Sequence, residues 1–128
     1  MIETTTAAFV FSFFVVILVL FQLALALGVP WGEMAMGGKF PGRFPIAMRI
    51  SALLQLLLLV FMALVVLTRA GLILGEFFQF SISAIWFVVG VSVVSAVLNT
   101  ITPSKKERIL WSPVTFILVI CAFVVALS

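Results

Sequence analysis

Long apolar stretches alternate with short polar connections along the whole chain. Four stretches contain almost no charged side chain, and each has the roughly 20 residues that a helix needs to cross a hydrocarbon core of about 30 Å. They cover residues 7–28, 46–68, 77–98 and 109–127. Two basic connections, residues 29–45 and 99–108, join them into two hairpins. The pattern predicts an all-α integral membrane protein, in which residues 1–128 form a single four-helix transmembrane bundle.

Local signals mark several helix ends. Pro45 suits the first turn of the second helix, where its missing N–H costs nothing, and Gly71 suits a left-handed residue after its end. Ser104 followed by Glu107 matches a capping box, so the fourth helix should begin there. Pro113 falls about two turns later and should either kink this helix or separate a short interfacial helix from it.

The composition supports this assignment and limits the possible chemistry. Of the 128 residues, 66% are hydrophobic and 9% are charged, whereas a soluble domain is roughly 45–50% apolar. The chain has no histidine, aspartate or tyrosine, which excludes histidine-ligated haem, histidine-containing metal sites and nucleophiles activated by histidine. We expect no metal and no cofactor. The one cysteine, Cys121, excludes an intrachain disulfide.

The distribution of cations predicts the orientation. Arg69 alone belongs to the side of the membrane that holds the termini, and the other cations belong to the opposite side: Lys39, Arg43, Arg49, Lys105, Lys106 and Arg108. The positive-inside rule then places both basic connections in the cytoplasm and both termini outside. Trp31 and Trp111 fall at the same boundary, as in an aromatic belt. Because the cations flank membrane spans and form no stripe on a soluble face, we expect no nucleic-acid partner.

Few polar side chains lie inside the predicted spans, and they lie at similar depths. Counted from the cytoplasmic ends, they lie on the order of 6–15 Å below the basic face. These residues are Gln22, Gln55, Ser92 and Ser95. Asn99 shares a helical face with the two serines, since the spacings are three and four. They predict a polar pocket open to the cytoplasm; alternatively, they only hydrogen-bond one helix to another.

The connection of residues 29–45 concentrates glycine, proline and charge. Gly37 and Gly38 can turn backbone N–H groups toward an anion, and the start of the second helix adds its positive dipole end. We therefore predict a site for the phosphate head group of a membrane lipid or isoprenoid. Its candidate ligand-binding residues are Trp31, Glu33, Lys39, Arg43, Arg49, Asn99 and Glu107. The structural alternative is a bridge from Glu33 or Glu107 to Arg49 that clamps the hairpins together.

The layout resembles that of small four-span bacterial membrane proteins of unknown activity. The resemblance implies a bacterial inner-membrane protein and implies nothing about activity. The positions that carry it are Pro30-Trp31-Gly32, Gly37-Gly38, Pro45, Arg49, Asn99 and Glu107. Small multidrug exporters are similar in size, but their first span contains a proton-coupling glutamate, which residues 7–27 do not contain.

Three functions are consistent with the sequence. The first is a non-enzymatic module that binds a lipid head group or a partner membrane protein through the first basic connection. The second is a small oligomeric transporter that uses Glu33 or Glu107 as its ion-coupled carboxylate. The third is a membrane-embedded enzyme acting on a lipid, with Glu33 as general acid or base and Arg49 holding a phosphate. We favour the first because no complete catalytic set is present.

Overall fold

The computed structural model describes residues 3–128, and within this range all regular structure is helical. The four α-helices are α1 (Thr4–Ala26), α2 (Ile46–Arg69), α3 (Phe78–Ile101) and α4 (Lys105–Ala126). Three short 3-10 turns lie between them: η1 (Gly32–Met34), η2 (Met36–Gly38) and η3 (Gly75–Phe77). Each of the four described α-helices is long and apolar enough to cross a membrane. The predicted all-α membrane fold is confirmed.

The start of α4 confirms one half of the predicted capping box. Ser104 is the N-cap, and its hydroxyl accepts a hydrogen bond of 3.2 Å from the Glu107 backbone N–H. The reciprocal bond is absent, because the Ser104 N–H donates to the Thr102 hydroxyl instead, at 3.2 Å. The carboxylate of Glu107 is therefore free to bond elsewhere. α4 continues through Pro113 to Ala126, so the segment before Pro113 belongs to α4 and is no separate interfacial helix.

The ends of α2 and α3 refine the sequence-based bounds. Pro45 lies just outside the first turn of α2, as its N-cap residue. Gly71 follows the α2 C-cap with a φ of +78°, the predicted left-handed conformation. α3 continues to Ile101, so Asn99 lies in its last turn and not in a loop.

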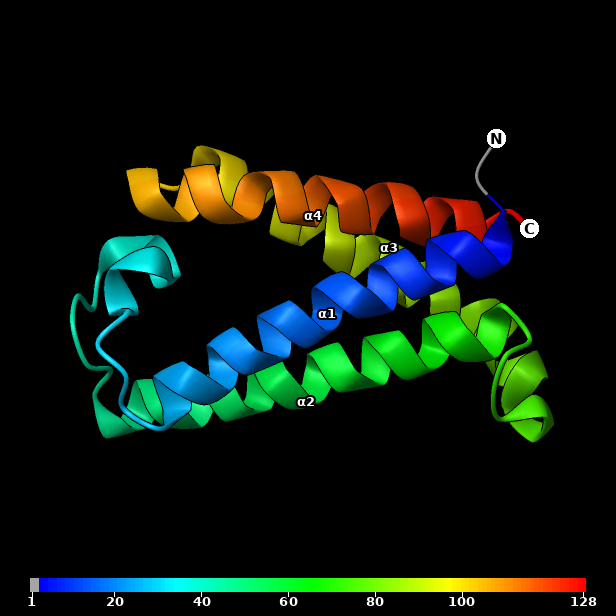
Figure 1. Ribbon diagram of the computed structural model, residues 1–128, viewed down its shortest axis with the longest axis horizontal. Helices are drawn as coiled ribbons and strands as arrows, with labels where there is room; N and C mark the ends of the chain where they lie inside the picture. Colours follow the sequence, from blue (N-terminus) through cyan, green and yellow to red (C-terminus); the bar gives the residue numbers. More distant parts are fainter. Residues whose placement is uncertain (1–2) are drawn as a thin grey trace.

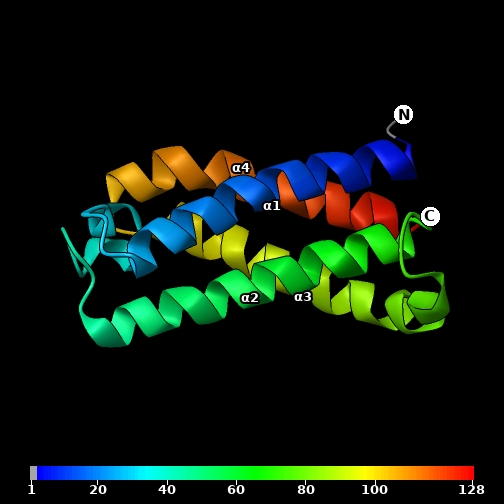
Figure 2. The ribbon, with the colours of Figure 1, turned by 60° about the horizontal axis from the view of Figure 1, so that its bottom comes forward.

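The helices form a ring in which each one packs against the next along the chain, and α1 also packs against α4. We call the end of the bundle with the chain termini and η3 the terminal end, and the end with residues 29–45 and the α3–α4 connection the loop end. Figure 1 shows α1 lying against α4 at the terminal end and separating from it toward the loop end, where η1 and η2 occupy the space between them. Figure 2 shows the same crossing from another side, with α2 also distant from α4 at the loop end.

Two hydrophobic clusters follow from this crossing. At the terminal end, small side chains of α1 and α4 are fully buried, among them Ala8 and Ala122 at 0% exposure. At the loop end, a second cluster is built around larger side chains, including Phe21, Phe44 and Trp111. The bundle is therefore tightly packed near the termini and wider near the loops.

Candidate functional site

The connection of residues 29–45, which we call loop 1, folds back on itself. The Gly32 N–H donates to the Gly42 carbonyl at 2.9 Å. A Cβ atom added to Gly32 would lie 1.9 Å from the Phe40 carbonyl oxygen, so the loop closes only because residue 32 has no side chain. This closure holds η1 and η2 in a defined position over the loop end of the bundle.

Loop 1 is fastened to the start of α4 by contacts of both backbone and side chains. The Trp111 indole N–H donates to the Met34 carbonyl at 3.0 Å, and the Ser104 hydroxyl donates to the Glu33 carbonyl at 2.7 Å. Lys106 and Glu33 form an ion pair of 2.6 Å whose side chains are half-exposed. These contacts join the two basic connections at the same end of the molecule.

Glu107 makes a further hydrogen bond between α4 and loop 1. Gly37 has a φ of +68°, which favours glycine, and its N–H donates to Glu107 Oε1 at 3.2 Å. The sequence assigned this N–H to a ligand's phosphate; in the structure it binds a carboxylate of the protein itself. Glu107 is 9% exposed.

A cavity of about 590 Å³ lies between the four helices at the loop end, beneath η1 and η2. Most of its lining is apolar, from residues such as Leu18, Leu59 and Leu118. The exposed residues on the lining are in loop 1, in the last turns of α3 and in the α3–α4 connection, and they include Lys39, Leu98 and Pro103. The cavity thus opens sideways, between loop 1 and α3, at the basic end of the bundle.

Every residue of the predicted polar pocket lies on the lining of this cavity. These residues are Gln22, Gln55, Ser92 and Ser95. The Gln22 amide donates to Gln55 Oε1 at 3.1 Å, which links α1 to α2. Two buried atoms on the lining have no hydrogen-bond partner within residues 3–128: Gln22 Oε1 and the hydroxyl of Ser92, which is 1% exposed. Part of the polar set thus joins helices, and part of it is buried beside the cavity without a partner in the described chain.

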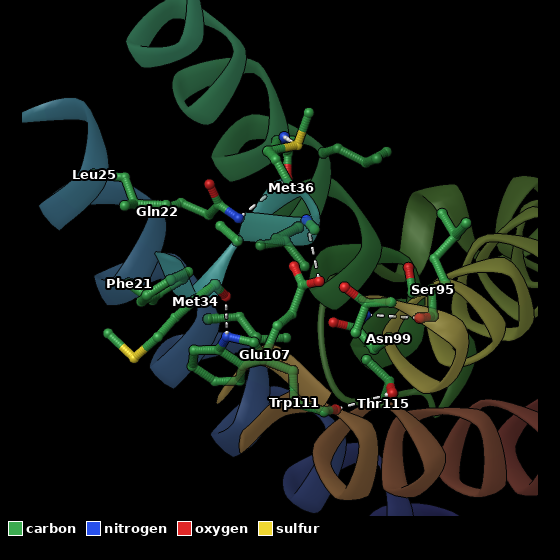
Figure 3. A pocket seen from close by; sticks show the side chains of 18 of the residues that line it. Phe21, Gln22, Leu25, Met34, Met36, Ser95, Asn99, Glu107, Trp111 and Thr115 are labelled. Atoms are coloured by element: carbon green, nitrogen blue, oxygen red, sulfur yellow. Dashed lines mark hydrogen bonds between the residues drawn. The ribbon is translucent and has the colours of Figure 1, made fainter. Parts of the chain in front are cut away.

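The predicted ligand-binding residues divide into two groups. Lys39, Asn99 and Glu107 lie on the cavity lining. Figure 3 shows Asn99 and Glu107 entering the cavity from α3 and α4, with Gln22 and Met36 on the other side. The others do not line the cavity: Trp31, Glu33, Arg43 and Arg49.

Arg49 contacts loop 1 and the chain just after α1. Its Nε donates to the Phe44 carbonyl at 3.0 Å, and a Cβ added to Gly28 would lie 2.9 Å from its guanidinium. A cation beside the C-terminal end of α1 interacts favourably with the helix dipole. The proposed bridges from Glu33 or Glu107 to Arg49 were wrong, since Lys106–Glu33 is the ion pair that residues 3–128 form.

Most of the lining residues were missed by the sequence reasoning, among them Met34, Trp111 and Thr115. Trp111 was interpreted only as a membrane-boundary aromatic. The signal was present in α4, because residues four apart lie on one helical face. Glu107, Trp111 and Thr115 therefore had to point in the same direction, whereas nothing in the sequence placed Met34 against them.

The chemistry of the cavity is suited to binding an amphiphile. Its titratable groups are Glu107 and Lys39, and no group of three His, Cys, Asp or Glu side chains within the described chain is arranged to hold a metal. Comparisons with protein-family models, with curated proteins and with solved structures find no match to this chain.

Proposed function

We propose that this integral membrane protein binds one molecule of a phosphate-bearing lipid in the loop-end cavity. The lipid enters sideways between loop 1 and α3, its phosphate lies near Lys39, and its chain follows the apolar lining. Ligand sites have volumes of roughly 300–1,000 Å³, mostly apolar walls and a few polar groups. The cavity of about 590 Å³ has these properties.

The observation that carries the proposal is the position of this cavity at the basic end of the bundle. A closed helix bundle gains nothing from an internal space, because unfilled volume forfeits packing contacts. Buried polar atoms without partners, such as the Ser92 hydroxyl, add a further cost unless a ligand or water bonds them. A resident amphiphile offsets both costs.

We also propose a membrane and an orientation for the protein. The loop end carries Lys39, Arg43, Lys105, Lys106 and Arg108, whereas Arg69 lies at the terminal end. By the positive-inside rule the loop end faces the cytoplasm, and we place the protein in a bacterial inner membrane with both termini outside. Anionic or zwitterionic phosphates of the cytoplasmic leaflet then lie at the height of the opening.

The test is a matched pair of phenylalanine substitutions on α3. Ser95→Phe fills the cavity, whereas Ser83→Phe adds the same side chain on an exposed face of the same helix. We expect the lipid that co-purifies with the protein, counted by native mass spectrometry, to fall about tenfold in Ser95→Phe, the effect of losing roughly 1.4 kcal/mol of binding. Ser83→Phe should retain as much lipid as the unmodified protein. Equal retention by both variants would exclude the cavity as the site.

A transporter is the second candidate, and one observation favours it. Glu107 is a buried carboxylate on the cavity lining, and carboxylates inside membrane proteins often couple ions to transport. Glu33 is less suited to that role, because it lies outside the cavity in an ion pair with Lys106. Substrate uptake into proteoliposomes that is abolished by Glu107→Gln and unaffected by Glu33→Gln would support transport over simple binding.

A further inference from the structure

The two charged residues on the cavity lining, Lys39 and Glu107, have no ion-pair partner within residues 3–128. Glu107 is 9% exposed, and within residues 3–128 its carboxylate accepts one hydrogen bond, from the Gly37 backbone N–H. The neighbouring Lys106 is paired with Glu33 instead. A buried charge is normally paired, because its desolvation costs far more than one neutral hydrogen bond returns. The site therefore favours a cation beside Glu107.

Two side-chain amides on the cavity lining direct their N–H₂ groups to the protein and leave an oxygen as an acceptor. The Asn99 amide N–H₂ donates to the Ser95 carbonyl at 2.7 Å, which directs the Asn99 side-chain oxygen away from that bond. Gln22 has its amide N–H₂ on Gln55, which leaves its oxygen unpaired. Both residues line the same cavity as Glu107 (Figure 3). A ligand that matches them carries N–H or O–H donors, as well as positive charge.

An opposite charge lies on the same lining. Lys39 makes no ion pair and no side-chain hydrogen bond in the part of the chain that the structure describes. The matching ligand has an anionic group near Lys39 and a cationic hydrogen-bond donor near Glu107. Its hydrocarbon chain lies along the leucines of the lining. A zwitterionic lipid has these three parts. A quaternary ammonium satisfies the charge but has no N–H to donate, so the acceptors favour a primary ammonium.

We infer that the cavity selects a zwitterionic phospholipid whose head group ends in a primary ammonium. The ammonium binds Glu107 and Asn99, and the phosphate binds Lys39. This inference rests on the proposed lipid-binding function and adds the class of lipid to it.

The experiment uses the full chain in mild detergent and three lipids with identical acyl chains. Phosphatidylethanolamine has a primary ammonium, phosphatidylcholine a quaternary one, and phosphatidylglycerol none. We expect the protein to bind them in that order of affinity in native mass spectrometry, with phosphatidylethanolamine about tenfold ahead of phosphatidylglycerol, the usual size of one charge-assisted contact. Glu107→Gln should remove this preference, and Lys39→Gln should weaken all three while preserving their order.

Glu33→Gln is the matched control, because it neutralises a carboxylate outside the cavity; it should leave the preference intact. If Glu107→Gln is not recovered folded, Asn99→Leu removes an acceptor from the same site and should reduce the preference in its place. Equal binding of the three lipids, together with a loss of all binding in Ser95→Phe, would overturn the selectivity and leave the proposed function standing. Binding unaffected by Ser95→Phe would overturn both. Competition by water-soluble phosphoethanolamine as strong as that of the lipid would assign the site to a free phosphorylated amine and overturn the lipid.

Discussion

The two halves of the bundle, at the terminal end and at the loop end, are made from the same four helices but pack in different ways. Near the termini, alanines of α1 and α4 such as Ala8 and Ala122 let the helices approach closely, as small residues do between membrane helices. Near the loops, Phe21 and Trp111 meet between the same two helices with ring centroids 4.7 Å apart. Side-chain size therefore sets helix separation, and the cavity lies where large side chains and loop 1 replace alanine.

Polar side chains differ between the halves as well. Near the termini, Thr68 and Ser81 donate to carbonyls of their own helices, both at 2.6 Å. Two atoms are exceptions there, since the buried Ser12 hydroxyl and Arg69 Nε have no partner in the described chain. Near the loops, Gln22 bonds across helices, and the buried Ser92 hydroxyl has no partner in the described chain. Each half thus contains two buried polar atoms without a partner in the described chain, but only those of the loop end belong to residues on the cavity lining.

The largest expected effect comes from adding volume to each half. Ala122→Leu should lower the free energy of unfolding by about 2–3 kcal/mol, because Ala122 is fully buried and the new atoms have no space. Ser95→Leu adds a similar side chain toward the cavity and should change the same quantity by less than about 1 kcal/mol. Denaturant unfolding in mild detergent measures both. Similar losses in the two variants would mean that the halves do not differ in packing.

A smaller effect is expected where loop 1 is held over the cavity. Trp111→Phe keeps the aromatic ring but removes the indole N–H that bonds the Met34 carbonyl, and it should cost about 1–2 kcal/mol. Hydrogen exchange at residues 32–38 should become faster, since that bond ties loop 1 to α4. Trp86→Phe is the control: Trp86 is half-exposed on α3, and the change should stay within about 0.5 kcal/mol. Unchanged exchange in Trp111→Phe would show that other contacts hold the loop.

The smallest effect is expected at the ion pair on the outer surface of the loop end. Lys106→Gln breaks the pair with Glu33, whose side chains are 65% and 48% exposed, and should lower the free energy of unfolding by at most about 0.5 kcal/mol. Lys105→Gln alters a neighbouring cation that forms no ion pair within residues 3–128, and it serves as the control for charge. A loss above about 1 kcal/mol relative to Lys105→Gln would identify the pair as a principal support of loop 1.

Local signals predicted those features that depend on neighbouring residues. Ser104 caps α4 and Gly71 ends α2 as expected, because both depend on backbone geometry within one turn. The partners of charged residues were not predictable in this way. Arg49 and Lys106 belong to the same side of the membrane, so only the path of loop 1 decides that Glu33 pairs with Lys106.

The cavity is another feature that local signals did not predict. Four short spans suggest little interior, and the sequence-based transporter hypothesis required an oligomer for that reason. The crossing of α1 over the bundle instead opens a space within a single chain. That crossing depends on which faces of two distant helices carry alanine and which carry aromatic rings, and hydropathy alone does not report such pairing.

The sequence by itself determined that the chain forms four apolar membrane helices, that its cations gather at one end, and that glutamine and serine lie at similar depths near that end. Composition, spacing and helical rise suffice for these features, since each is a property of one segment. Only the tertiary structure decided that these polar residues line one cavity, that Gly37 bonds Glu107, and that Arg49 lies outside the site. Helical periodicity sets the faces within one helix, but rotation and crossing between helices follow from side-chain packing across the whole bundle.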